Sequence, residues 1–119
     1  MTTAEFEKIV VDAIAEIPQE LQSQIDNVEI VIEDWPSKNQ LGDYESPYDL
    51  LGLYHGIPKT ERENYSALPD KISLFKEPIL ATAHSEEAIR HAIRETILHE
   101  LGHHFGLSDE ELEKTEDKH

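Results

Sequence analysis

The segment His99-Glu100-Leu101-Gly102-His103-His104-Phe105-Gly106-Leu107-Ser108-Asp109 lies at the end of a long helical pattern. Upstream, Ser85-Glu86-Glu87 supplies a capping side chain and two acids suited to the positive end of a helix dipole. Apolar side chains then recur on two sides of the helix: Ile89, Ile93 and Ile97 on one, and Leu98, Leu101 and Phe105 on the other. This pattern predicts a central, largely buried helix over residues 85–105, ended by Gly106.

The same segment has the spacing of a catalytic zinc site. His99 and His103 are four residues apart, so their imidazoles project from nearly the same helix face and can reach one ion. Glu100 is rotated by about 100° from His99, which suits a general base facing the attacking water rather than a ligand. Gly106 can adopt the left-handed conformation and turn the chain back, so that Asp109 becomes the third ligand. Two imidazoles and one carboxylate leave a fourth position open, which is typical of catalytic rather than structural zinc.

Each of these residues also has an ordinary structural interpretation. The two histidines could be helix surface residues, and Glu100 could pair with a neighbouring histidine on the same helix. Asp109 could serve only the start of a last short helix, because Ser108 and Glu111 have the spacing of a capping box. His104 lies about 100° around the helix from His103 and is not expected to share the ion.

Length and composition restrict the remaining functions. The 119 residues predict a single domain over residues 1–119, with a solvated tail from about residue 112. The net charge of −16 argues against nucleic acid and anionic membrane surfaces as partners. With no cysteine, any metal must be held by histidines and carboxylates. There is no long apolar segment or secretory signal, so we expect a cytoplasmic protein.

The other elements follow from periodicity and turn residues. Helices are predicted over residues 4–17 and from Pro18 to near Ile25. Short apolar or alternating stretches predict three strands: residues 28–33, 50–55 and 71–76, the last ended by Pro78. Two long loops are expected between them, over residues 34–50 and 57–70. The fold class is therefore α+β, with a small mixed or antiparallel sheet packed on the central helix.

Four stretches together resemble a known family. The motif His99-Glu100-x-x-His103-x-x-Gly106-x-x-Asp109 occurs with Glu33-Asp34-Trp35-Pro36, Leu51-Gly52-Leu53-Tyr54-His55-Gly56-Ile57-Pro58 and Pro69-Asp70-Lys71-Ile72. Over about residues 4–115 the chain is similar to the small bacterial minimal zincins, and the resemblance implies a compact zincin-like metallopeptidase. Metzincins place a methionine turn after the third ligand, whereas the one methionine here is Met1 and ten residues follow Asp109.

The predicted function is hydrolysis of peptide bonds by water that a zinc ion activates, with Zn²⁺ held by His99, His103 and Asp109 and with Glu100 as the base. The partner would be an extended peptide or protein lying along the strand 71–76 by strand addition. The alternative is a binding module that keeps the zincin scaffold without catalysis. Four tyrosines are candidates to stabilise an oxyanion: Tyr44, Tyr48, Tyr54 and Tyr65.

Overall fold

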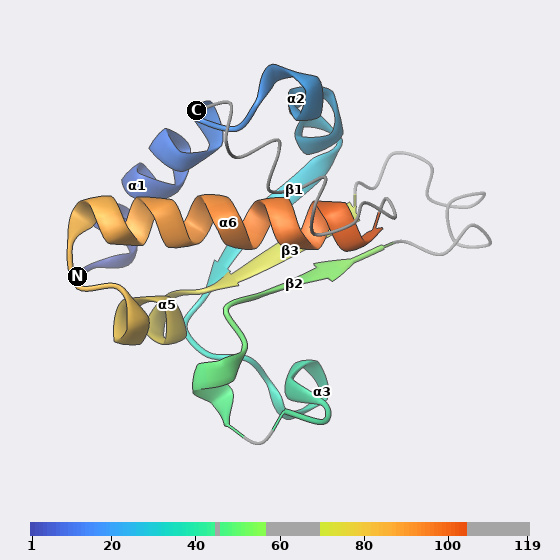
Figure 1. Cartoon of the computed structure of the whole chain (residues 1–119). Coiled ribbons are helices and arrows are strands. Elements are labelled where there is room, and N and C mark those ends of the chain that lie inside the picture. The colour runs from blue at the N-terminus through green and yellow to red at the C-terminus, as the bar shows by residue number, and fades with distance from the viewer. Residues whose placement is uncertain (45, 57–69, 105–119) are drawn as a thin grey trace.

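A three-stranded mixed sheet lies against a long helix in the computed structural model, which describes residues 1–44, 46–56 and 70–104 (Figure 1). Strand β3 (Asp70–Phe75) is central. It pairs in parallel with β1 (Val28–Glu33) and antiparallel with β2 (Gly52–His55). The predicted α+β class and mixed sheet are confirmed.

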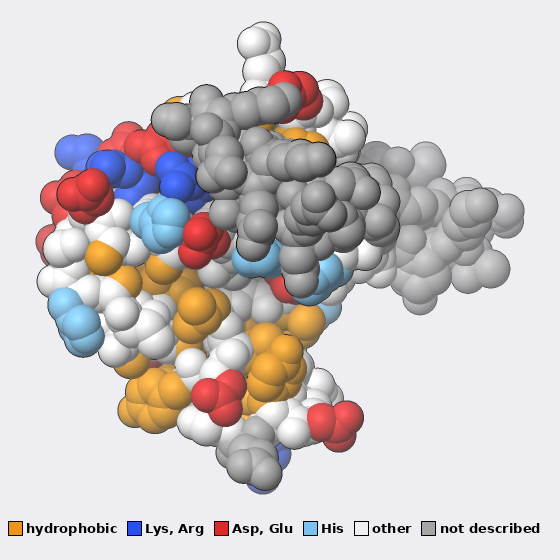
Figure 2. Space-filling model, in the orientation of Figure 1, with side chains coloured by type: hydrophobic (Ala, Val, Ile, Leu, Met, Phe, Trp, Pro, Cys, Tyr) orange, Lys and Arg blue, Asp and Glu red, His pale blue; other side chains and the backbone are white. Residues whose placement is uncertain are grey.

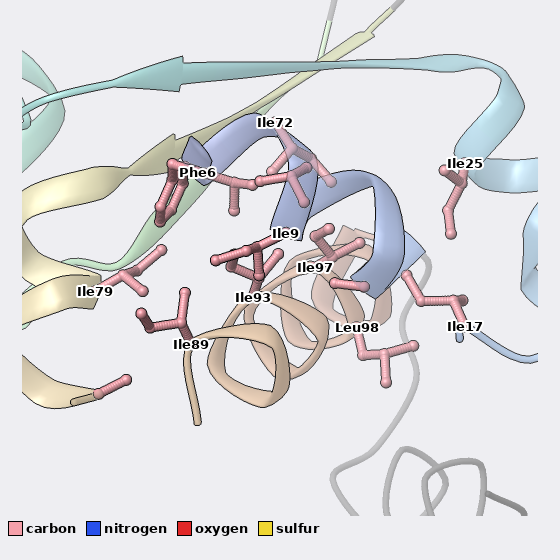
Figure 3. Close-up of a cluster of buried hydrophobic side chains, with 14 of the residues drawn as sticks. Phe6, Ile9, Ile17, Ile25, Ile72, Ile79, Ile89, Ile93, Ile97 and Leu98 are labelled. Carbon is pink, nitrogen blue, oxygen red and sulfur yellow. The ribbon is translucent and has the colours of Figure 1, made fainter. Parts of the chain in front are cut away.

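Helices α1 (Thr3–Ala15) and α6 (Glu86–His104) pack against each other and cover one face of the sheet. Figure 3 shows their apolar side chains meeting those of β3, with Phe6 and Ile9 from α1, Ile93 and Ile97 from α6, and Ile72 from the strand. Phe6, Ile72, Ile93 and Ile97 are fully buried. Both apolar sides of α6 are used, as the sequence predicts, because its isoleucines and leucines all contribute to this core.

Helix α2 (Gln19–Asp26) leads from α1 into β1, and α5 (Lys76–Thr82) leads from β3 towards α6. Helix α5 is absent from the sequence prediction, in which Pro78 only ends a strand. Pro78 instead lies in the first turn of this helix, where a backbone N–H has no intrahelical partner and proline is therefore tolerated.

The predicted loop over residues 34–50 was wrong in part, since it contains two short helices. Helix α3 (Lys38–Leu41) begins with a reciprocal capping box between Ser37 and Gln40. The 3₁₀ helix η1 (Pro47–Asp49) begins with proline and is capped by Ser46. These local signals are too short to produce a hydrophobic period, so the periodicity of the sequence does not show them.

The expected position of the strand 71–76 at the edge of the sheet was wrong. It corresponds to β3, which is flanked on both sides, whereas β1 and β2 are the outer strands of the described sheet. The predicted loop 57–70 lies outside the described residues except for Asp70, and so do the helix end at Gly106 and the predicted last helix. No helix in the described part of the chain is long and apolar enough to cross a membrane.

Candidate active site

A cleft of about 280 Å³ separates α6 from the segment that leads into β2. Its α6 wall is formed by Ala92, Glu95, Thr96, His99 and Glu100. The opposite wall is formed by Tyr44, Asp49, Leu50, Leu51 and Gly52. Figure 2 shows this side of the molecule, where histidine side chains follow α6 and apolar side chains fill the surface between α6 and the region of α3 and η1. The cleft thus combines an apolar surface with the predicted catalytic residues.

His99 and His103 lie on one exposed face of α6, as their spacing predicts. Their ring centroids are 6.1 Å apart and the rings are tilted by 44°. Two neighbouring imidazoles can supply nitrogen ligands to one zinc ion. The structure therefore brings the two histidines together on one face, and their role as zinc ligands stays a prediction.

Glu100 follows His99 in sequence but is directed elsewhere. Its side chain is half-buried, and its Oε1 accepts a hydrogen bond from the main-chain N–H of Tyr54 on β2 at 2.8 Å. One residue along a helix corresponds to a rotation of about 100°, which takes Glu100 from the exposed histidine face towards the strand. Glu100 is thus held at the side of the cleft, next to the two histidines rather than in line with them.

Gly52 allows α6 and β2 to approach closely enough for this contact. A Cβ atom on Gly52 would lie 2.5 Å from Thr96 Cγ2 and 3.1 Å from the main-chain oxygen of Ser73. No larger residue fits without movement of the helix or the strand. Gly52 is not among the site residues predicted from the sequence, although a glycine inside a predicted strand is a recognised signal of close backbone approach.

The candidate tyrosines have different environments. Tyr44 lines the cleft. The Tyr48 ring makes an edge-on contact with Trp35 at a centroid distance of 5.1 Å. The hydroxyl of Tyr54 donates to Asp70 Oδ2 at 2.5 Å. Tyr65 lies outside the described residues. Tyr44 is therefore the tyrosine that the structure brings to the cleft among those it describes.

Asp109, the third predicted ligand, lies outside the described residues. Within residues 1–44, 46–56 and 70–104, no group of three or more histidine or acidic side chains is arranged to hold a metal ion. His91 is engaged along α6, with Nε2 3.0 Å from Glu95 Oε1. The predicted ligand set is therefore represented by its two histidines, and the position of its carboxylate stays a prediction.

A comparison with protein families gives a match. A family model described as zincin-like metallopeptidase matches residues 25–119. The matched region contains both walls of the cleft and the whole stretch from His99 to Asp109. A search of the curated proteins found no match.

Proposed function

Because this chain belongs to the zincin-like metallopeptidase family, we propose that it is a zinc-dependent peptidase whose active site is the cleft between α6 and residues 44–52. One observation carries the proposal: His99 and Glu100 line the same cleft, and His103 shares the exposed face of His99. Metal-assisted hydrolysis requires a ligand pair and, in the same cleft, a carboxylate that is not itself a ligand and can take a proton from the attacking water.

The zinc ligands in this proposal are His99, His103 and Asp109. When bound, zinc would supply a Lewis acid for the scissile carbonyl and would lower the pKa of a water molecule. His99 and His103 are both exposed on α6, and His99 lines the cleft. Asp109 is assigned from the motif, since a carboxylate completes the set of donors that a catalytic zinc site uses.

Glu100 has the role of general base. Its carboxylate takes a proton from the water that attacks the peptide carbonyl and later delivers that proton to the leaving amine as the carbon–nitrogen bond breaks. The hydrogen bond from Tyr54 uses Oε1, which leaves Oε2 for this proton. Glu100 is therefore suited to proton transfer by orientation as well as by chemistry.

The substrate in this proposal is an extended peptide lying in the cleft beside β2. This strand replaces β3 as the candidate for strand addition, because β2 is an outer strand and Gly52 lines the cleft. Among the residues that the structure describes, the lining includes the carboxylates of Asp49, Glu95 and Glu100 and no lysine or arginine. Together with the net charge of −16, this lining favours peptides with basic side chains.

The substitution Glu100→Gln tests the mechanism. Zinc-loaded wild-type protein should hydrolyse a fluorescein-labelled casein or a pool of basic peptides, and the variant should lose about 10²–10⁴-fold in rate while keeping its zinc. Glu87→Gln, which removes the same charge from the first turn of α6, serves as the matched control.

An equal rate in Glu100→Gln and wild type would contradict the peptidase mechanism. A wild-type protein that binds zinc and basic peptides without cleaving them would instead support the non-catalytic binding module.

A further inference from the structure

We propose that the main-chain amide of Tyr54 positions the Glu100 carboxylate, so that the outer strand β2 and not α6 alone sets the orientation of the base. This inference rests on the proposed function, in which Glu100 transfers the proton. Tyr54 would be a positioning residue acting through its backbone, and it would not contact the reacting atoms itself.

The pairing of β2 explains why this amide is available to Glu100. The main-chain N–H of Phe75 donates to Leu51 O at 2.9 Å, and the register continues as Leu53 opposite Ser73 and His55 opposite Lys71. In an antiparallel pair, alternate residues direct their main-chain groups to the partner strand. Tyr54 lies between two such residues, so its N–H points away from β3, towards the outer edge. The 2.8 Å contact with Glu100 Oε1 lies on that edge.

The contact restrains a side chain that would otherwise rotate freely. A glutamate has several rotatable bonds, and a helix fixes only the first atoms of the side chain. A main-chain donor in a paired strand is fixed, so a charge-assisted bond to Oε1 defines the plane in which Oε2 lies. Among the described residues, Glu100 makes this one hydrogen bond and no ion pair. The strand therefore supplies the restraint, while the second oxygen stays available.

Gly52 and Thr96 set the distance across which the contact forms. Thr96 precedes Glu100 by one helical turn, and its Oγ1 donates to Ala92 O at 2.7 Å, which orients the side chain. Its Cγ2 methyl occupies the space that a Cβ on Gly52 would need, at 2.5 Å. The close approach of helix and strand at Gly52 thus holds the Tyr54 amide within hydrogen-bond distance of Glu100.

Amide hydrogen exchange measured by NMR on the full ¹⁵N-labelled chain tests this inference, first without metal and then with Zn²⁺ as the probe. Glu100→Ala should accelerate exchange of the Tyr54 amide by about tenfold or more, because an acceptor is removed. Glu100→Gln should keep the protection, because its amide oxygen still accepts. The Leu53 amide, which faces β3, should be unchanged in both variants and is the internal control.

Exchange of the Tyr54 amide with zinc bound distinguishes a positioning role from a contact that exists only in the metal-free protein. If Tyr54 positions Glu100, its amide stays protected when zinc binds. Unchanged exchange in Glu100→Ala, or loss of protection on zinc addition, would overturn the inference alone. A chain that binds no zinc near neutral pH would overturn the proposed function and the role of Tyr54 with it.

The substitution Gly52→Ala provides a second, independent test of the inference. The added methyl should push α6 away from β2, accelerate Tyr54 exchange and slow casein hydrolysis by about tenfold, with zinc affinity unchanged. Thr96→Ser in the same chain removes the opposing methyl and should restore protection in part. If Gly52→Ala fails to fold, the Glu100→Ala and Glu100→Gln pair decides the matter; if it folds with normal Tyr54 protection, the role of Gly52 is wrong.

Discussion

At the scale of single residues, His99 and Glu100 show how neighbouring positions on one helix come to lie in different environments. His99 is exposed, whereas Glu100 is half-buried and bonded to a strand amide. The difference follows from the rotation of about 100° between consecutive helical residues. In the proposed mechanism, the exposed residue is a ligand and the strand-facing residue is the base.

Asp109 supports a prediction at this scale. Asp109→Asn should weaken zinc binding by about tenfold or more, because a neutral amide replaces a charged ligand. The melting temperature without metal should hardly change, since Asn is well tolerated at a helix start. Metal titration with a competing chelator measures the affinity.

Glu110→Gln is the matched control, because it removes one negative charge from the next residue. Equal zinc affinity in Asp109→Asn and wild type would return Asp109 to a purely structural role at the start of a last helix.

At the scale of elements, α1 supports α6 by packing along it. The buried side chains of α1, Phe6, Ile9, Val10 and Ala13, belong to the same core as Ile93 and Ile97 of α6. Its first turn carries a capping box, in which the Glu5 N–H donates to Thr2 Oγ1 at 3.1 Å while Thr2 N–H and Oγ1 donate to Glu5 Oε1. The backbone hydrogen bond from Thr2, and then its hydroxyl, lower the pKa of Glu5.

This cap predicts a pH-dependent stability. The pKa of Glu5 is lower in the folded state, so the capping contribution is present at about pH 6 and is lost as the pH falls below about 4. Thr2→Ala should therefore lower the melting temperature by a few degrees at about pH 6 and by less at about pH 3. Thr2→Ser, which keeps the hydroxyl, should behave like wild type. A penalty independent of pH would show that the Thr2 hydroxyl does not act through the charge of Glu5.

At the scale of the whole molecule, the chain carries a net charge of −16. Excess like charge opposes the folded state, and a dication bound only by the folded chain stabilises it. The proposed zinc site is therefore expected to affect global stability as well as chemistry.

Thermal unfolding measures this effect. Zinc at about a hundredfold excess over its Kd should stabilise the protein by about 2.7 kcal/mol, which raises the melting temperature by several degrees. Mg²⁺ should do little, because it prefers oxygen ligands in an octahedral arrangement. His99→Ala should abolish the zinc response and leave the metal-free melting temperature nearly unchanged, since His99 is exposed. A wild-type transition that zinc does not move would contradict the metal site.

Local patterns in the sequence predicted α1, α2, α6 and the three strands, but not α3, η1 or α5. The apolar positions of α6 predicted a buried helix, and the β-branched residues at 28–33 predicted β1 with its observed bounds. Both signals depend only on residues close together in the sequence. The shared face of His99 and His103 follows from helix geometry in the same way. The role of Asp109 stays a prediction, because the described residues end before it.

Only the tertiary structure decided how these elements meet. Strand order depends on which strands pair with each other across the sheet. The sequence of one apolar strand does not specify its neighbours, so the central position of β3 was not predictable. The cleft wall around Tyr44 and Leu51 and the bond between Tyr54 and Glu100 join residues distant in sequence. They exist because Gly52 lets the strand reach the helix, a close contact that only the packed structure creates.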